Sequence, residues 1–171
     1  DFVKPGENIL PMIDVSGSMT GLPMEVAISL GLYLSQKNKG KFNGKYLTFS
    51  ETPKLGQIPN GTLSEIYDKM EGDTWGLNTD FNKAYGLILD LAEMFDVKDE
   101  DMPTMLLVLS DMQFDEAGGR GFYGSGSGGS SYQNICDAFK AAGYVDEYGE
   151  AITPHMVMWN LRGNTLDFPA K

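Results

Sequence analysis

Oxygen-bearing side chains that suit a hard cation occur in three separate stretches of the sequence. Asp14, Ser16 and Ser18 alternate within one short stretch, Thr79 comes much later, and Asp111 follows an apolar run. Mg2+ prefers near-octahedral oxygen coordination at ~2.1 Å, keeps several waters and takes only one or two carboxylates. Two aspartates and three hydroxyls meet that preference and leave a coordination position for a carboxylate from elsewhere. The sequence therefore predicts a divalent-cation site formed by these five residues.

The first stretch also has the spacing that such a site needs. Alternate residues of a tight loop can aim their side chains into one hollow, and Gly17 permits the sharp bend. The chain has one cysteine, Cys136, and one histidine, His155, so a soft ligand set for zinc or copper is not expected. Mg2+ is the expected cofactor, with Mn2+ or Ca2+ as substitutes. Taken alone, the Asp-x-Ser-x-Ser pattern also fits a helix-capping turn.

Alternating and apolar stretches predict the elements that position these residues. The run 104–109 is typical of a strand covered on both faces. Apolar residues at three- and four-residue spacing predict a helix over 81–95, with Asp80 as its cap. Thr62 and Glu65 have the spacing of a capping box at the start of another helix. In full, we expect strands at 8–13, 45–50, 54–58, 104–109 and 155–159, and helices at 24–34, 62–70, 81–95 and 132–142.

The alternation of strands and helices predicts an α/β fold. Its sheet should be doubly wound and mostly parallel, with helices on both faces. The stretch 54–58, bracketed by Pro53 and Pro59, is expected to form a short antiparallel edge strand. Pro11 is awkward within the first strand, because proline removes a ladder hydrogen bond. In such sheets ligands bind at the carboxyl edge, where all three oxygen-bearing stretches would meet.

The 171 residues are expected to form a single domain. Residues 118–131 are rich in glycine and serine and are interpreted as a flexible linker, either an engineered splice or a natural low-complexity loop. The net charge of −11 disfavours direct nucleic-acid binding. Apolar runs fall short of the ~20 residues that cross a bilayer, so no membrane association is expected. The lone Cys136, interpreted as a core thiol, indicates a reducing intracellular (cytoplasmic) compartment.

The segment Asp14-Val15-Ser16-Gly17-Ser18-Met19, with Thr79 and Asp111 in later loops, resembles the metal-ion-dependent adhesion site of von Willebrand factor A domains. The resemblance extends over residues 9–159. Residues 110–115 and 159–162 further resemble a group of uncharacterised intracellular proteins that carry this domain. The resemblance to von Willebrand factor A domains also implies a final helix after the last strand, which we do not expect within these 171 residues.

That resemblance implies a role for each ligand and a binding function. Ser16 and Ser18 would bind the metal directly, and Thr79 directly or through water. Asp14 and Asp111 would act mostly through waters, and an Asp or Glu of a protein partner would complete the coordination shell. The expected protein is thus a metal-dependent adhesion or scaffold module and not an enzyme.

Two other functions stay open at the level of sequence. An aspartate after a first strand can serve as the nucleophile of a Mg2+-dependent phosphoryl-transfer enzyme. Such enzymes usually have a second aspartate two residues on, where this chain has Ser16, and the sequence contains no phosphate-binding Gly-x-x-x-x-Gly-Lys loop. The chain could also belong to an RNA-associated complex, although its acidic balance argues against direct contact with RNA.

Overall fold

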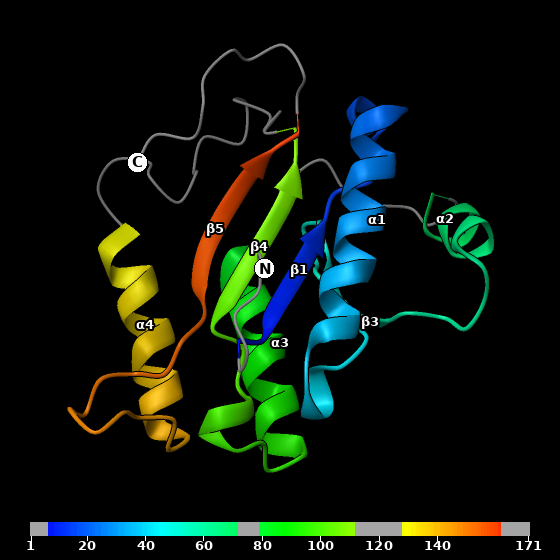
Figure 1. Ribbon diagram of the computed structural model, residues 1–171. Helices are drawn as coiled ribbons and strands as arrows, with labels where there is room; N and C mark the ends of the chain where they lie inside the picture. Colours follow the sequence, from blue (N-terminus) through cyan, green and yellow to red (C-terminus); the bar gives the residue numbers. More distant parts are fainter. Residues whose placement is uncertain (1–6, 72–78, 112–127, 162–171) are drawn as a thin grey trace.

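The computed structural model describes residues 7–71, 79–111 and 128–161. Five strands form one sheet in the order β3-β2-β1-β4-β5 (Figure 1). The strands are β1 Ile9–Ile13, β2 Lys45–Thr48, β3 Leu55–Gln57, β4 Met105–Ser110 and β5 His155–Asn160. The helices are α1 Leu22–Lys37, α2 Leu63–Glu71, α3 Phe81–Met94 and α4 Gly128–Ala141.

Four of the five strands run parallel. β1 pairs in parallel with β2 and β4, and β4 pairs in parallel with β5, whereas β3 is antiparallel to β2 at one edge. This confirms the predicted α/β class, including the short antiparallel edge strand. Because β1, β2 and β4 run in one direction, the loops that follow them leave the same edge of the sheet.

Side chains on the two faces of the sheet pack into two separate apolar clusters. Along β1 and β4, alternate residues point to opposite faces, as the period of a strand requires. Leu10 and Val108 pack in the cluster that includes α3 and α4, whereas Ile13 and Leu107 pack in the cluster that includes α1 and α2. In Figure 1, α1 lies in front of the sheet and α3 behind it. The prediction of helices on both faces is confirmed.

A close contact between α1 and β1 fixes the position of the loop that joins them. Gly31 faces β1, and a Cβ atom at this position would lie 2.8 Å from Cγ1 of Ile13. Only a glycine lets the helix approach this closely without moving Ile13. The helix α1 therefore packs directly against Ile13, the residue that precedes Asp14.

Pro11 is accommodated by the register of the central strand. β1 pairs with β4 over its whole length but with β2 only at Met12 and Ile13. The proline thus precedes the stretch that is paired with β2. Pro11 is therefore paired with β4 on one side and has no partner in β2 on the other.

The predicted helix starts are formed as expected. The backbone N–H of Thr62 donates to Oε2 of Glu65 at 2.8 Å, and the N–H of Glu65 lies 3.4 Å from the Thr62 hydroxyl, which together form the capping box of α2. Asp80 accepts a hydrogen bond from the N–H of Lys83 at 3.2 Å and caps α3. Each cap gives orphan N–H groups of the first turn a partner.

Apart from shifts of a few residues at the ends of elements, the structure departs from the predictions in three places. Residues Gly17–Met19, expected to be a simple loop, form a 3-10 turn. The helix α4 begins at Gly128, so its first turn lies in the stretch assigned to a linker, and 118–127 falls outside the described residues. Cys136 is half-buried on α4 instead of lying in the core. Glycine and serine composition indicated a linker over 118–131, whereas α4 begins at Gly128, before the expected start at Tyr132.

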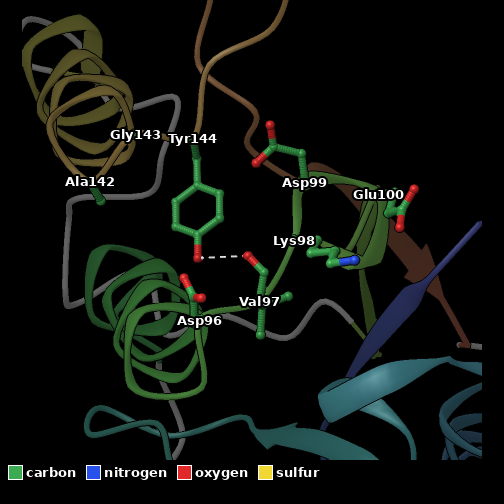
Figure 2. Close-up of a pocket in the computed structure, with 8 residues that line it drawn as sticks. All are labelled: Asp96, Val97, Lys98, Asp99, Glu100, Ala142, Gly143 and Tyr144. Atoms are coloured by element: carbon green, nitrogen blue, oxygen red, sulfur yellow. Dashed lines mark hydrogen bonds between the residues drawn. The ribbon is translucent and has the colours of Figure 1, made fainter.

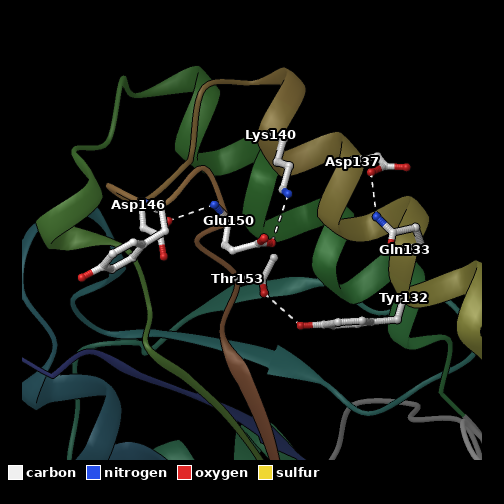
Figure 3. Close-up of polar contacts among 8 residues, drawn as sticks. Tyr132, Gln133, Asp137, Lys140, Asp146, Glu150 and Thr153 are labelled. Carbon is white, nitrogen blue, oxygen red and sulfur yellow. Dashed lines mark hydrogen bonds and ion pairs between the residues drawn. The ribbon is translucent and has the colours of Figure 1, made fainter.

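Polar contacts connect α4 to the segment that leads into β5 (Figure 3). Lys140 Nζ lies 3.1 Å from Oε2 of Glu150, and the hydroxyl groups of Tyr132 and Thr153 are 3.3 Å apart. These exposed contacts lie between α4 and the chain that follows it into β5. In the described residues, no helix is both long and apolar enough to span a membrane.

Candidate metal site at the carboxyl edge

The first loop of the site begins where β1 ends. The N–H of Asp14 donates to the carbonyl oxygen of Leu109 at 3.0 Å, which continues the pairing of β1 with β4 by one residue. Oδ1 of Asp14 then accepts a hydrogen bond from the N–H of Ser16 at 2.8 Å. Asp14 is 2% exposed and Ser16 is 8% exposed. The loop therefore folds back on its own first carboxylate and buries it.

The 3-10 turn brings the two serine hydroxyls of this loop together. Oγ of Ser16 and Oγ of Ser18 are 3.1 Å apart. Two neighbouring ligands of an octahedral Mg2+ ion, each at ~2.1 Å, are separated by about 3.0 Å. The spacing of the hydroxyls thus fits adjacent positions on one such ion. Gly17 and Ser18 are exposed, so this end of the cluster opens to solvent while the Asp14 end is buried.

The end of β4 reaches the same carboxylate from the neighbouring strand. The hydroxyl of Ser110 donates to Oδ2 of Asp14 at 2.6 Å, a short bond of the charge-assisted kind. Asp111 follows immediately and is 4% exposed. The β4 end thus supplies one residue that holds Asp14 and a second buried carboxylate.

Thr79 approaches the edge from the start of α3. Its hydroxyl donates to the carbonyl oxygen of Ser50 at 2.9 Å and lies 4.0 Å from Sδ of Met12. Ser50 follows β2, and the N–H of Phe49 donates to the carbonyl oxygen of Ile13 at 3.1 Å. Thr79 therefore lies at the carboxyl ends of β1 and β2.

The five predicted ligands thus fall into a bonded group and two flanking residues. Hydrogen bonds join Asp14, Ser16 and Ser18 directly. Asp111 connects to them through its neighbour Ser110, and Thr79 connects to the same edge through Ser50 and β1, its hydroxyl being bonded to neither serine. A hydroxyl that binds a metal uses an oxygen lone pair, and its proton then needs another acceptor. The carbonyl of Ser50 is such an acceptor.

No ion pair among the described residues balances the negative charge of Asp14. The two ion pairs found among the described residues, Lys83 with Asp80 and Lys140 with Glu150, do not involve Asp14. Burying a carboxylate is costly unless it is hydrogen-bonded and its charge is balanced. Among all the residues that the structure describes, no three His, Cys, Asp or Glu side chains form a group that could hold a metal ion. Any ion here would depend mainly on hydroxyl and water oxygens, as the chemistry of Mg2+ allows.

Two contributors to the site were missed by sequence reasoning. Ser110, which directly precedes Asp111, was not among the predicted ligands, and its position at the end of a buried strand was the signal that could have marked it. The carbonyl of Ser50 has no signal in the sequence, because every residue has a backbone carbonyl. Both act on predicted ligands through hydrogen bonds over a long sequence separation.

Together the sheet and this buried cluster define an α/β domain with a polar site at the carboxyl ends of its central strands. Residues 8–171 match a domain family of unknown function designated DUF7788, and the chain belongs to this family. It is also similar to the uncharacterized protein L728 of Acanthamoeba polyphaga mimivirus, with 32% identity over 177 residues. That match covers 99% of this chain but 29% of the viral protein, so the chain spans less than a third of its relative.

Proposed function

We propose that this chain is a metal-dependent protein-binding module of the von Willebrand factor A type. It would hold one divalent cation, Mg2+ by preference over Mn2+ or Ca2+, and capture an acidic group of a partner protein. The observation that carries the proposal is the buried Asp14 carboxylate, which accepts from the N–H of Ser16 and forms no ion pair among the described residues. The hydroxyl of the same Ser16 lies 3.1 Å from that of Ser18. A cation would balance this charge and use those hydroxyls as ligands.

The accessible end of the cluster supports binding to a partner. Ser18 is exposed, whereas Asp14 and Asp111 are buried, so the ion would lie between a buried acidic side and an open side. In this arrangement Ser16 and Ser18 would bind the ion directly, and the two aspartates would hold its waters. A carboxylate offered by a partner would then complete the shell from solvent.

The environment of Asp14 favours a holding role over a nucleophilic one. An aspartate nucleophile must present an oxygen to its substrate. Asp14 is 2% exposed, and each of its oxygens already accepts a hydrogen bond. We therefore prefer a binding module to a phosphoryl-transfer enzyme. The net charge of −11 likewise favours a protein partner over direct contact with RNA, and the single cysteine favours a reducing intracellular compartment.

The metal is tested with Mn2+ as a probe and Mg2+ as its competitor. Electron paramagnetic resonance should show Mn2+ bound to the chain and displaced by Mg2+. Added acetate should lower the number of waters on the bound Mn2+, as measured by water-proton relaxation, because it takes the open position. Asp14→Ala should abolish binding while circular dichroism shows the fold intact. Ser35→Ala provides the control, because Ser35 is a buried serine that donates to Leu32 within α1.

Partner capture is tested with immobilised peptides that carry Asp or Glu, beside copies that carry Asn or Gln instead. The chain should be retained by the acidic peptides in Mg2+ and released by a chelator. Equal capture by the Asp14→Ala variant, or equal capture by the amide copies, would contradict the proposal.

A further inference from the structure

Both oxygens of the Asp14 carboxylate are held by donors from two different elements. Oδ1 accepts from the N–H of Ser16 in the following loop, and Oδ2 accepts from the hydroxyl of Ser110 at the end of β4. Ser110 is 1% exposed, so water does not replace its hydroxyl readily. The plane of the carboxylate is thereby fixed, and it cannot rotate without losing one of these bonds.

We infer that Ser110 is a positioning residue that sets the ion selectivity of the proposed metal site. With Oδ1 engaged by Ser16 and Oδ2 by Ser110, Asp14 is held where it orients the waters of the ion, and it cannot turn both oxygens inward to coordinate one ion directly. Ca2+ accepts bidentate carboxylates and six to eight ligands, whereas Mg2+ takes single oxygens in a strict octahedron and keeps its waters. A carboxylate locked in this way therefore favours Mg2+ over Ca2+. This inference rests on the proposed function, since it assumes that a cation binds beside Asp14.

Hydrogen bonds to ligand residues also affect affinity. Residues that orient metal ligands typically change metal affinity about 10–100-fold when they are removed. Loss of the Ser110 hydroxyl should weaken Mg2+ binding by a factor in this range. Ca2+ should lose less, because the freed Oδ2 can then bind the larger ion, so the preference for Mg2+ should fall about tenfold.

The matched pair Ser110→Thr and Ser110→Val separates the hydroxyl from the shape of the side chain. Threonine and valine have nearly the same shape, but only threonine keeps a donor for Oδ2. Calorimetric titrations with Mg2+ and with Ca2+ would be made on the 171-residue chain, its Ser110→Ala variant and this pair. Ser35→Ala again controls for the loss of a buried serine hydroxyl away from the site. Thermal unfolding in a chelator reports the fold of each variant.

We expect Ser110→Thr to keep the affinities of the original chain, and Ser110→Val and Ser110→Ala to lose Mg2+ preferentially. If Ser110→Ala does not fold, the comparison of threonine with valine decides. Equal affinities for the threonine and valine variants would overturn the inference, as would equal losses for both ions, which would mark Ser110 as structural only. If the original chain binds neither ion, the proposed function fails and this inference fails with it. If it binds Mg2+ and only the Ser110 variants behave otherwise than expected, the proposed function stands.

Discussion

Near the amino edge of the sheet the buried polar side chains are neutral, the amides of Asn8 and Asn38 and the hydroxyl of Ser35, whereas at the carboxyl edge they include the carboxylates of Asp14 and Asp111. Asn8 and Asn38 are 2% and 3% exposed. Asn38 accepts from the N–H of Ile9 at 2.7 Å and donates to its carbonyl oxygen at 2.8 Å. Asn8 accepts from the N–H of Lys39 and donates to the carbonyl oxygen of Asp101. These amides meet backbone groups in complementary pairs.

The carboxyl edge has a different balance. Asp14 receives hydrogen bonds from Ser16 and Ser110, but these donors carry no charge, and Asp111, the residue after Ser110, is also buried. Each of these amides has a partner for its oxygen and for its NH2 group, while the Asp14 carboxylate carries a charge that its neutral donors do not balance. Buried polar groups at the amino edge thus satisfy the backbone, whereas those at the carboxyl edge bring negative charge into the interior.

The amino edge does hold charges, but they are on its surface. A hollow of about 710 Å3 lies there, lined by Asp96, Lys98, Asp99, Glu100 and the buried Tyr144, among others (Figure 2). Its acidic side chains are accessible to water, which stabilises their charge without a bound ion. Acidic composition alone therefore does not distinguish a site, whereas burial of the carboxylate does.

The largest expected effect comes from removing the charge at the carboxyl edge. Asp14→Asn keeps an oxygen acceptor but loses the negative charge, so Mg2+ affinity should fall by about 100-fold or more. The free energy of unfolding in a chelator should be unchanged or raised, because a neutral amide is cheaper to bury than a charge. Calorimetry and urea unfolding measure the two quantities. If the variant lost stability in the chelator and kept its Mg2+ affinity, Asp14 would serve the fold and would not bind the ion.

At the amino edge, loss of a buried polar side chain should lower the free energy of unfolding and leave Mg2+ affinity unchanged. Asn38→Ala leaves the N–H and the carbonyl oxygen of Ile9 buried without their side-chain partners. Each unsatisfied group costs roughly 1–3 kcal/mol, so the free energy of unfolding should fall by about 3 kcal/mol. Urea unfolding measures this loss, and Mg2+ affinity at low temperature, where the variant is folded, should equal that of the original chain. A parallel loss of affinity would show that the two edges are coupled.

Much of the fold could be predicted because its strands are buried on both faces. The apolar run 104–109 has no alternation, and it corresponds to β4, which lies between β1 and β5 with helices over both faces. The ends of elements were harder to predict. A helix expected over 24–34 extends over Leu22–Lys37, because apolar spacing marks the buried face and does not mark the exposed first and last turns.

The candidate site, too, was only partly predictable from the sequence. The types and spacing of Asp14, Ser16 and Ser18 were visible in the sequence, and the structure joins them by hydrogen bonds. The bond from Ser110 to Asp14 spans 96 positions and depends on the pairing of β1 with β4, which no local pattern encodes. The acceptor at Ser50 is a backbone atom. Side-chain chemistry was therefore predictable, and the groups that orient it were not.

A smaller effect is expected at the acidic hollow of the amino edge. The Tyr144 hydroxyl donates to the carbonyl oxygen of Val97 at 3.1 Å. Burial, and then the negative charges of Asp96, Asp99 and Glu93, raise the pKa of Tyr144 above its ordinary value of 10.0. Its neutral form is thus favoured in the folded state, so its contribution to stability is present below pH 10 and is lost as the pH rises through the raised pKa.

Tyr144→Phe removes this hydrogen bond and this titration. The free energy of unfolding near neutral pH should fall by about 1 kcal/mol, and its decline at alkaline pH should become less steep. Urea unfolding over a series of pH values checks both, and Mg2+ affinity should not change. An alkaline decline as steep as that of the original chain would mean that other groups cause it.

The smallest effect is expected at the start of α2, which belongs to neither edge. Hydrogen bonds from the Thr62 backbone N–H and then from its hydroxyl lower the pKa of Glu65 from its ordinary value of 4.5. A lowered pKa means that this contribution is present above the unfolded-state pKa and is lost as the pH falls through the folded-state pKa. Thr62→Ala removes the hydroxyl donor and keeps the N–H, so the pKa of Glu65 should rise only part of the way toward its ordinary value.

Carboxyl carbon shifts in an NMR titration measure this change directly. Ser64→Ala, an exposed serine beside the capping pair, is the matched control and should leave the pKa of Glu65 where it is. Mg2+ affinity should be the same in both variants, because an exposed capping carboxylate already has its charge stabilised by water and by the first-turn N–H groups. A change in Mg2+ affinity on removing the Thr62 hydroxyl would show that surface carboxylates also govern the ion. The distinction between buried and exposed acids, on which the comparison of the two edges rests, would then be wrong.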